Sequence, residues 1–223
     1  PNPDRLYRRI LIAALWIAAI PLVGKYVIIA LSSILVLTVS THFLTIAAFL
    51  SCMILFVYPL LLLGTVTPSL VKYCTDNLQD NGRIVGTLGA FNTIGSILGT
   101  FLPTFITIPA VGTAITFLLF SGVLLLLALI YFFHTGRSRR WCQAAIVLFL
   151  LCSAWGHNDS FAFWKDNLLY EGESVYNYLQ VEETPDSRIL STNVLLGVQS
   201  IQPKHGGLTG MYYDYALAAP VMA

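Results

Sequence analysis

The sequence has few charged residues and a large excess of apolar ones. Only 10% of its 223 residues are charged, whereas 57% are hydrophobic and the mean hydropathy is +0.75. A soluble domain contains about 25% charged residues, so this composition excludes a wholly soluble globule and a disordered chain. Lys and Arg number 12 against 11 Asp and Glu, which excludes nucleic acid as a partner bound through a basic surface.

Motifs typical of secreted proteins and metal sites are also missing. The four cysteines have no C-x-x-C spacing and the histidines show no H-E-x-x-H pattern, so we expect buried cysteines, no disulfide framework and no metal site. No signal peptide is recognisable near the N-terminus. Because residue 1 is Pro rather than Met, we expect a fragment of a longer protein.

The charges are divided unequally along the chain. Residues 1–155 contain nine Lys or Arg and three Asp or Glu, whereas residues 156–223 contain three and eight. This change predicts a domain boundary near Trp155–Asn158. We therefore expect a transmembrane helical region over 1–155 and a water-exposed domain over 156–223.

The apolar part contains stretches long enough to cross a lipid bilayer as helices. A hydrocarbon core about 30 Å thick requires roughly 20 apolar residues. The expected fold class is therefore mainly α, a polytopic transmembrane helical bundle of about five spans. The candidate spans are residues 10–40, 43–63, 84–102, 113–133 and 141–155. The first is long enough for one tilted helix or two short crossings, and the last is short for a span.

Arginine clusters indicate the orientation of these spans. One cluster precedes the first span and another follows residues 113–133, whereas the 103–112 loop is uncharged. The positive-inside rule places both clusters in the cytoplasm. If 141–155 crosses, the acidic part lies outside, and if it only lies in the interface, that part stays inside. We expect an integral protein of the bacterial inner (plasma) membrane with its C-terminal domain in the cytoplasm.

The third candidate span carries a helix-packing motif. Gly95 and Gly99 form a G-x-x-x-G pattern, which favours close helix approach either within the chain or at a homodimer face. Asn92 is expected to form an interhelical hydrogen bond because an unpaired amide is costly in lipid. The spans 43–63, 84–102 and 113–133 contain no Asp, Glu or Arg, which disfavours an ion-coupled transporter.

The acidic part has the alternating pattern of short strands. Strands are predicted over 175–181, 188–190 and 194–200. Turns are predicted at Pro185-Asp186 and Gly206-Gly207, and a helix over 208–218. The expected structure is a small antiparallel β unit leading into a helix.

Several residues of this part carry a family likeness. They are Glu173–Tyr176, Val181, Arg188, Leu190, Gly197–Ser200, Tyr212–Tyr215 and Pro220. Their order resembles the N-terminal β domain of the spermidine synthase (polyamine aminopropyltransferase) family. The apolar part, through Leu63–Pro68 and Gly86–Gly99, is similar to the spans of bacterial proteins that fuse helices to a spermidine synthase-like domain.

The resemblance implies aminopropyl transfer from decarboxylated S-adenosylmethionine, the co-substrate, to a polyamine. By motif, Gln199 falls on a glutamine that contacts the nucleoside, and Tyr212 on a pocket tyrosine beside the polyamine. Asp214 stands where the family has Glu, and Asn177 where it has Gln in the first strand. These four residues are the candidate substrate-binding residues.

The family's catalytic site requires a Rossmann-like domain after the β unit. No strand followed by a Gly-rich loop and a helix is found up to Ala223. We therefore expect no catalytic residue and no cofactor in this fragment, and transfer only in the full-length form. Tyr213 and Ala218 also depart from the family's Gln and His. The alternative function is a multi-span transporter or a membrane scaffold with an acidic extramembrane cap.

Overall fold

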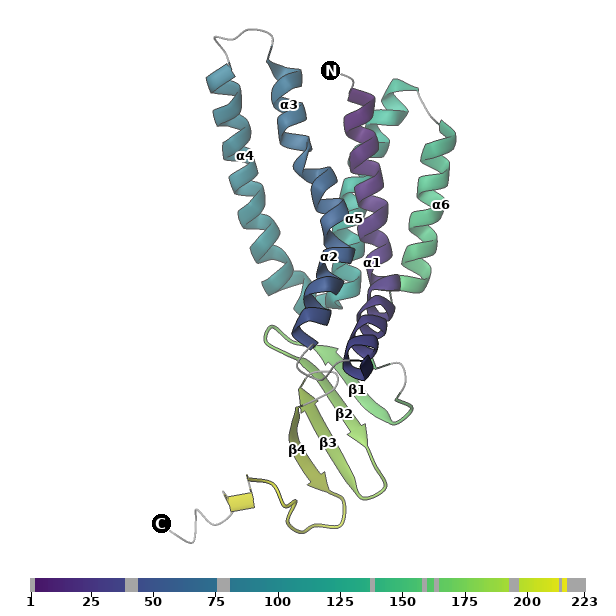
Figure 1. The fold of residues 1–223 in the computed structure, drawn as a ribbon, viewed down its shortest axis with the longest axis vertical. Coiled ribbons are helices and arrows are strands. Elements are labelled where there is room, and N and C mark those ends of the chain that lie inside the picture. The colour runs from purple at the N-terminus through teal and green to yellow at the C-terminus, as the bar shows by residue number, and fades with distance from the viewer. Residues whose placement is uncertain are drawn as a thin grey trace. The chain divides into compact units, whose positions relative to one another are not determined.

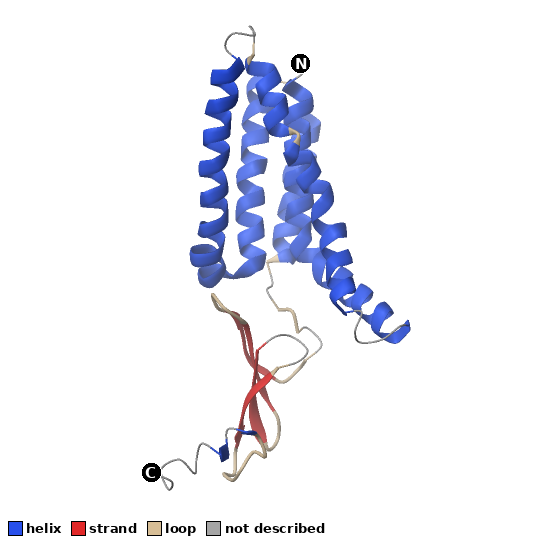
Figure 2. Ribbon diagram, turned by 60° about the vertical axis from the view of Figure 1, so that its left-hand side comes forward, coloured by secondary structure: helices blue, strands red, loops and turns tan. Residues whose placement is uncertain are grey.

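The computed structural model describes residues 3–38, 44–75, 81–136, 139–157, 160–162, 165–192, 197–212 and 214–215. The chain divides into two compact units, Pro1–Asp159 and Ser160–Ala223. The first unit is helical and the second contains an antiparallel sheet (Figures 1 and 2). The division falls close to the change in charge along the sequence.

The helical unit consists of long helices joined by short connections. They are α1 (Pro3–Thr38), α2 (Leu44–Gly64), α3 (Val66–Cys74), α4 (Asn81–Leu102), the π-helical turn η3 (Pro103–Thr107), α5 (Ile108–Thr135) and α6 (Arg139–Gly156). Helices α1, α2, α4, α5 and α6 coincide with the five apolar stretches found in the sequence. The stretch from residue 10 is one helix rather than two.

Three helical stretches of the described chain are long and apolar enough to cross a membrane. They are Pro3–Leu35, Thr45–Cys74 and Asn81–Thr135, and Arg140–Gly156 is a shorter apolar helix. The third stretch has 55 residues because α4, η3 and α5 follow one another without a gap. Three is fewer than the five spans expected, since two predicted spans share this stretch and another is short.

The chain reverses between α4 and α5. Figure 1 shows these helices running in opposite directions on either side of η3. Gly112, in the first turns of α5, has φ 84° and ψ 168°, a conformation that is essentially restricted to glycine. Gly112 therefore interrupts the regular helix between the two apolar segments 84–102 and 113–133.

Helix α1 packs against α2, α5 and α6 and forms the centre of this unit. Ala13, Ala14 and Ala18 are completely buried, and their small side chains allow the neighbouring helices to approach closely. The indole N–H of Trp16 donates a hydrogen bond to the carbonyl of Leu55 at 2.9 Å. This bond joins α1 to α2 across the apolar interface.

Two cysteines lie in this core, as expected, and two do not. Cys142 and Cys152 are buried on α6, whereas Cys52 and Cys74 are exposed, and all four are free thiols. The prediction of burial is therefore confirmed for Cys142 and Cys152 and wrong for Cys52 and Cys74.

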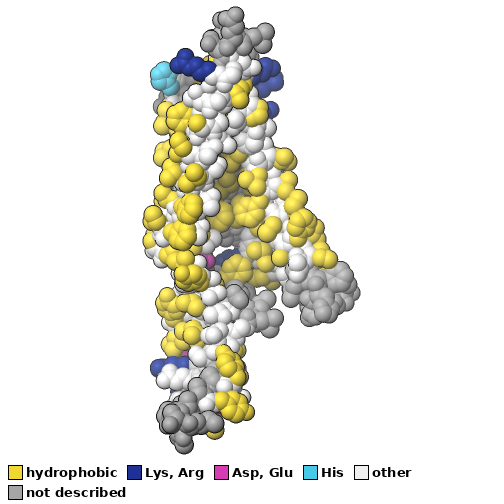
Figure 3. Space-filling model, turned by 90° about the vertical axis from the view of Figure 1, so that its left-hand side faces the viewer, with side chains coloured by type: hydrophobic (Ala, Val, Ile, Leu, Met, Phe, Trp, Pro, Cys, Tyr) yellow, Lys and Arg dark blue, Asp and Glu magenta, His cyan; other side chains and the backbone are white. Residues whose placement is uncertain are grey.

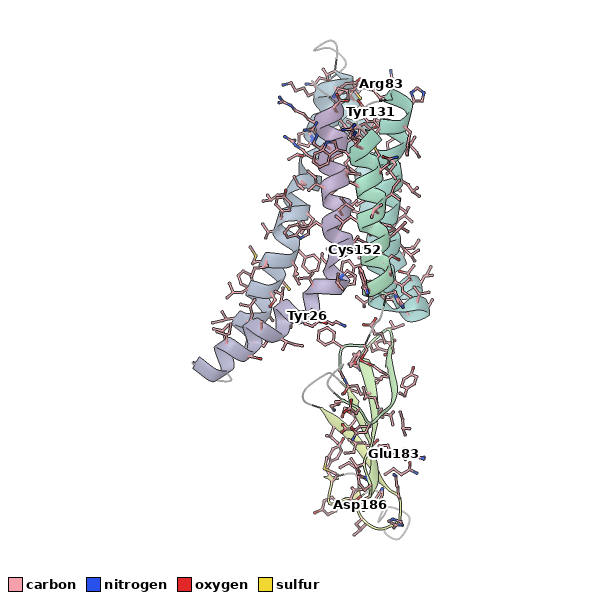
Figure 4. The ribbon with its side chains drawn as sticks, turned by 90° about the vertical axis from the view of Figure 1, so that its right-hand side faces the viewer. Tyr26, Arg83, Tyr131, Cys152, Glu183 and Asp186 are labelled. Atoms are coloured by element: carbon pink, nitrogen blue, oxygen red, sulfur yellow. The ribbon has the colours of Figure 1, made fainter. Side chains whose placement is uncertain are left out.

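Helix α1 bends in its middle, close to the labelled Tyr26 (Figure 4). Pro21 lies inside the helix, where its ring removes a backbone hydrogen bond and displaces the preceding turn. Gly24, one turn later, is buried, and a Cβ there would lie 3.5 Å from the Leu55 side chain. The bend therefore follows from the proline, and α2 packs beside α1 at Gly24 with room for an ordinary van der Waals contact.

Helix α4, like the short helix α3, contains no buried residue. A Cβ added at Gly95 or Gly99 would meet nothing within 4 Å, so the described chain does not use the G-x-x-x-G motif for internal packing. Asn92 is exposed, and no interhelical hydrogen bond of its side chain is found among the described residues. The expectation of tight packing within the chain is therefore wrong for the described residues.

The second unit contains a four-stranded antiparallel sheet in the order β1-β2-β3-β4. The strands are β1 (Leu168–Glu173), β2 (Tyr178–Glu183), β3 (Ser187–Thr192) and β4 (Val198–Pro203). The sequence predicted β2 and β3 with shifted ends and the first half of β4, and it missed β1; residues 194–196 of the predicted third strand lie outside the described part of the chain. A strand over 175–177 is prevented because the Ser174 hydroxyl accepts hydrogen bonds from the amides of Tyr176 and Asn177, which closes a turn.

The helix predicted over 208–218 is not formed at its start. Residues 208–211 are loop, Gly210 has φ 76°, and Tyr212, Asp214 and Tyr215 lie in a 3₁₀ turn. Residues 216–218 lie outside the described part of the chain. The β unit therefore leads into a loop and a single turn.

Gly197 is expected to be irreplaceable in the connection to β4. Its φ is 133°, and a Cβ there would lie 2.3 Å from the carbonyl oxygen of Thr192. Gly197→Ala should destabilise the β3–β4 pair by about 1–3 kcal/mol, so exchange of the Thr192 amide hydrogen should become roughly tenfold faster. Gly206→Ala is the control, since Gly206 has φ 73° but open space. Equal exchange at Thr192 in both variants would contradict the prediction.

Candidate functional site

Gln199 occupies an irregular position in the sheet. Leu190 pairs with Ser200 and Ser191 pairs with Val198, so the register shifts between them. Gln199 is the extra residue of this bulge, and its side chain is exposed. Bulges re-aim side chains and are frequent beside active sites. The predicted nucleoside-contacting glutamine is therefore held by a defined backbone feature and points out of the regular ladder.

Asn177 lies in the tight turn that precedes β2. Its backbone carbonyl accepts hydrogen bonds from the Ser174 amide at 2.9 Å and from the Ser174 hydroxyl at 2.8 Å. The side chain is exposed, and its amide makes no hydrogen bond among the described residues. The turn fixes the backbone of Asn177 and leaves its amide available to a ligand.

Asp214 holds its own loop together. One carboxylate oxygen accepts a hydrogen bond from the Thr209 hydroxyl at 2.7 Å, and the other accepts one from the Gly210 amide at 2.6 Å. The Thr209 hydrogen bond, assisted by backbone donors, lowers the pKa of the Asp214 carboxyl. Tyr212, on the same turn, is 69% exposed. The carboxylate is thus ionised at neutral pH and its charge is partly used within the loop.

The four predicted residues fall at two ends of the sheet. Asn177 precedes the start of β2 and Gln199 lies at the start of β4, at the same end, but β3 separates their strands by about 10 Å. The loop with Tyr212 and Asp214 follows β4 beyond Pro203, which pairs with Ser187 at the other end. A single pocket formed by all four residues remains a prediction.

A cavity on this unit lies at the end of the sheet where β4 finishes. It has a volume of about 220 Å³ and is lined by Arg188, Gln202, Pro203 and Lys204. It contains none of the predicted residues, and its two cations are unsuited to binding a polyamine. Among the described residues, no group of three or more His, Cys, Asp or Glu could hold a metal ion.

Sequence reasoning missed a buried polar cluster on the sheet. The Tyr178 hydroxyl donates to the Glu171 carboxylate, and the Gln180 amide donates to the Tyr178 oxygen at 3.1 Å. The same Glu171 oxygen accepts the backbone amides of Phe161 and Ala162 at 2.7 and 3.1 Å. These bonds attach the segment that enters this unit to the face of β1 and β2.

Gln180 is the most deeply buried polar residue of this cluster. It is 1% exposed, and its side-chain oxygen has no hydrogen-bond partner in the described structure. Leaving such an oxygen unpaired costs about 1–3 kcal/mol, and it can accept a hydrogen bond from an amine or hydroxyl donor. The sequence did contain a sign of this cluster. Tyr178 and Gln180 stand at alternate positions of one strand, which places two polar side chains on the same face.

Two acidic residues of the unit form ion pairs with Lys and Arg side chains. Glu183 accepts both Lys204, at 3.1 Å, and Arg188, at 3.3 Å, and the hydrogen bonds from Lys204 and Arg188 lower the pKa of the Glu183 carboxyl. Glu182 pairs with Lys165 at 2.7 Å. Figure 4 shows Glu183 at the same end of the sheet as Asp186. These two glutamates stabilise the unit internally and are poor candidates for binding a polyamine cation.

Comparison with known proteins gives one informative relative. Over 95 residues, or 43% of this chain, the sequence is 56% identical to a curated protein of Bifidobacterium longum named "Probable polyamine aminopropyl transferase". The aligned part covers 21% of that relative, so the match spans about a fifth of its length. No protein-family model matches the chain, and no solved structure matches it significantly.

The Glu183 ion pairs predict a pH dependence for the β unit. Because the folded pKa of Glu183 is lowered, its contribution is present above the unfolded pKa and is lost as pH falls through the folded value. Glu183→Gln should therefore lower the unfolding temperature of the unit at neutral pH. The difference from wild type should shrink below about pH 4.5 and vanish at lower pH.

Asp186→Asn is the matched control for this experiment. It removes a negative charge from the adjacent turn, but the Asp186 side chain forms no ion pair among the described residues. Unfolding of the full chain in detergent, followed by circular dichroism in the β region, measures both variants. An equal loss for the two variants, or a loss for Glu183→Gln that persists in acid, would refute the assignment.

Proposed function

We propose that this chain is part of a membrane-anchored polyamine aminopropyltransferase. The observation that carries the proposal is the 56% identity over 95 residues to a protein with that printed activity. This likeness supports the function at the level of the family. The order Gln199, Tyr212 and Asp214 in the β unit also supports it, because it resembles the family's motif.

In the proposed reaction, a neutral amine nitrogen of the polyamine attacks the methylene beside the sulfonium of decarboxylated S-adenosylmethionine. A carbon–nitrogen bond forms and the carbon–sulfur bond breaks with its electron pair on sulfur. A neutral thioether that carries the adenosyl and methyl groups leaves, and the new ammonium gives a proton to a base. We propose that a Rossmann-like domain of the full-length protein supplies the nucleoside pocket and this base.

The β unit would contribute binding groups to that site. The exposed amides of Gln199 and Asn177 can hydrogen-bond a nucleoside. The ring of Tyr212 offers an aromatic face to a cation, an attraction worth about 0.5–1 kcal/mol at an exposed site, and Asp214 offers a negative charge. These roles follow from the resemblance and from the exposure of the side chains.

Membrane anchoring is the second element of the proposal. At most 39% of the most apolar window in each long helical stretch is buried inside the structure. Figure 3 shows hydrophobic side chains distributed over the surface of the helical unit. Phe91, Ile97 and Phe101 of α4, for example, are more than half exposed. Lipid is the solvent in which such a surface is stable.

Transfer should depend on Gln199. With the full-length protein in lipid nanodiscs, release of the adenosyl thioether and polyamine products is measured by chromatography. Gln199→Ala should lower kcat/KM for the aminopropyl donor by about tenfold, the effect of losing one hydrogen bond to the ligand. Gln202→Ala is the control, since it removes the same side chain from an exposed position of the same strand.

The outcomes of this experiment separate the candidate functions. Wild-type transfer with a selective loss in Gln199→Ala supports both the activity and the site. Transfer that is equally reduced by Gln202→Ala contradicts the site. Absence of transfer and of nucleoside binding, together with substrate flux into vesicles, would favour the transporter.

The position of the charged residues supports an orientation in the membrane. Seven of the eight described Lys and Arg of the helical unit lie near the end where α1 starts and α3 ends, and Lys25 is the exception. By the positive-inside rule, we propose that this basic end faces the cytoplasm of a bacterial inner membrane. Figure 3 shows Lys, Arg and His side chains gathered there.

The direction of α6 supports a location for the residues after it that differs from the cytoplasmic one expected from the sequence. Cys142 belongs to the buried cluster that contains the first turns of α1, Cys152 belongs to the next cluster with Ala18, and Gly156 lies beside Leu22. Helix α6 therefore runs along α1 from the basic end for about 27 Å. We accordingly propose that residues from 157 onward lie on the non-cytoplasmic side.

Cysteine labelling tests this orientation. Asp186→Cys, introduced into the full-length protein after Cys52 and Cys74 are changed to Ser, should react with a membrane-impermeant maleimide in intact spheroplasts. Gly82→Cys, at the basic end, should react only after permeabilisation. The reverse pattern would place the β unit in the cytoplasm and contradict the proposed crossing of α6.

A further inference from the structure

A cavity of about 320 Å³ lies at the basic end of the helical unit. The first turns of α1, the end of α3 and the end of α5 form its walls. The side chains that the argument uses are Arg5, Arg9, Lys72, Tyr7, Tyr73 and Tyr131. Its volume is within the range of about 300–1,000 Å³ that is typical of small-ligand sites.

The charge of this cavity is entirely positive. Arg5 and Arg9 lie one turn apart on the same face of α1, and Lys72 comes from α3. No Asp or Glu lines the cavity, and none of the three cations forms an ion pair among the described residues. Three like charges around one small space repel one another, so an anion bound between them would be stabilised electrostatically.

Stacked tyrosines form the wall beside these cations. The rings of Tyr7 and Tyr131 are parallel, with centroids 3.9 Å apart. The Tyr131 hydroxyl donates to the Asp4 carboxylate at 2.7 Å. This bond draws the acidic group of the first turn of α1 toward Tyr131, and Asp4 is not part of the cavity lining.

The location of the cavity indicates which anion it would bind. It lies where three apolar helices end, and Leu6 and Leu70 line it next to the cations. Figure 4 shows Tyr131 and Arg83 together at this end of the unit. Tyrosines and cations at the ends of membrane helices lie at the level of the lipid headgroups, and basic pockets between such helices bind anionic headgroups.

We propose that this cavity binds a phosphate-bearing anion, namely the headgroup of an anionic phospholipid of the cytoplasmic leaflet. Arg5 and Arg9 would donate hydrogen bonds to the phosphate oxygens, and Lys72 would add a third positive charge. Leu6 and Leu70 would contact the first carbons of the acyl chains. The proposal rests on the proposed membrane embedding and orientation but is independent of the transferase activity.

Lipid binding by the full-length protein tests this site. The protein, exchanged into detergent, is titrated with phosphatidylglycerol or phosphatidylcholine, and bound lipid is counted by native mass spectrometry. Wild type should retain phosphatidylglycerol in preference to phosphatidylcholine. The combined variant Arg5→Gln, Arg9→Gln and Lys72→Gln should bind phosphatidylglycerol at least about tenfold more weakly.

Arg8→Gln is the matched control. Arg8 lies on the same turns of α1 but lines a different groove with Trp141, so this variant should bind phosphatidylglycerol like wild type. An equal loss in Arg8→Gln would mean that only the general charge of this end matters, and it would overturn the site. If the combined variant fails to fold, Lys72→Gln alone should still raise the dissociation constant measurably.

Inorganic phosphate distinguishes the two sources of the anion. Competition that requires a large excess of phosphate identifies a lipid site that recognises the phosphate group. Phosphate binding in lipid-free detergent that is as tight as phosphatidylglycerol binding, and equally sensitive to the combined variant, would overturn the lipid assignment in favour of a soluble anion. Absence of binding by either ligand would refute the proposal.

Discussion

The need to satisfy backbone hydrogen bonds would constrain the whole apolar part of this chain in the membrane that we propose. Helices meet that need internally, and α1 shows how they then pack. Its completely buried alanines, Ala13, Ala14 and Ala18, bring α2, α5 and α6 close, while Trp16 pairs its one polar atom with a carbonyl of α2. Departures from regular helix occur where a proline or glycine permits them, at Pro21 and Gly112.

The sequence predicted helices better than it predicted contacts. Hydropathy is a local property, so α1, α2, α4, α5 and α6 could be located from composition alone. The exposure of Gly95 and Gly99 could not be predicted, because a G-x-x-x-G motif favours a closely packed helix without specifying which helix that is. Strand β1 was missed because Gly172 interrupts it and its residues do not alternate regularly. The turn at Ser174 depends on a side-chain hydrogen bond, which shifted the start of β2.

The candidate site shows the same limit. Family order identified Gln199, but its place in a bulge depends on the pairing of β3 with β4, which spacing along the chain does not determine. Gln180 looked like an ordinary strand residue, but it is buried. Its cross-strand neighbour Glu171 accepts the backbone amides of Phe161 and Ala162, which lie far from Gln180 in the sequence. Burying the Gln180 side-chain oxygen without a hydrogen bond costs free energy of folding. Such positions in a protein often serve function rather than stability.

The unequal charges at the two ends of the helical unit link topology to the proposed chemistry. Decarboxylated S-adenosylmethionine carries a sulfonium and an ammonium, and the hydrocarbon core is a high barrier to such a cation. The side on which residues after 157 lie therefore determines which pool of donor a transferase there could use. A basic end anchored in the cytoplasmic leaflet and a β unit on the far side would require donor outside the cytoplasm. The orientation and the transfer reaction thus constrain each other.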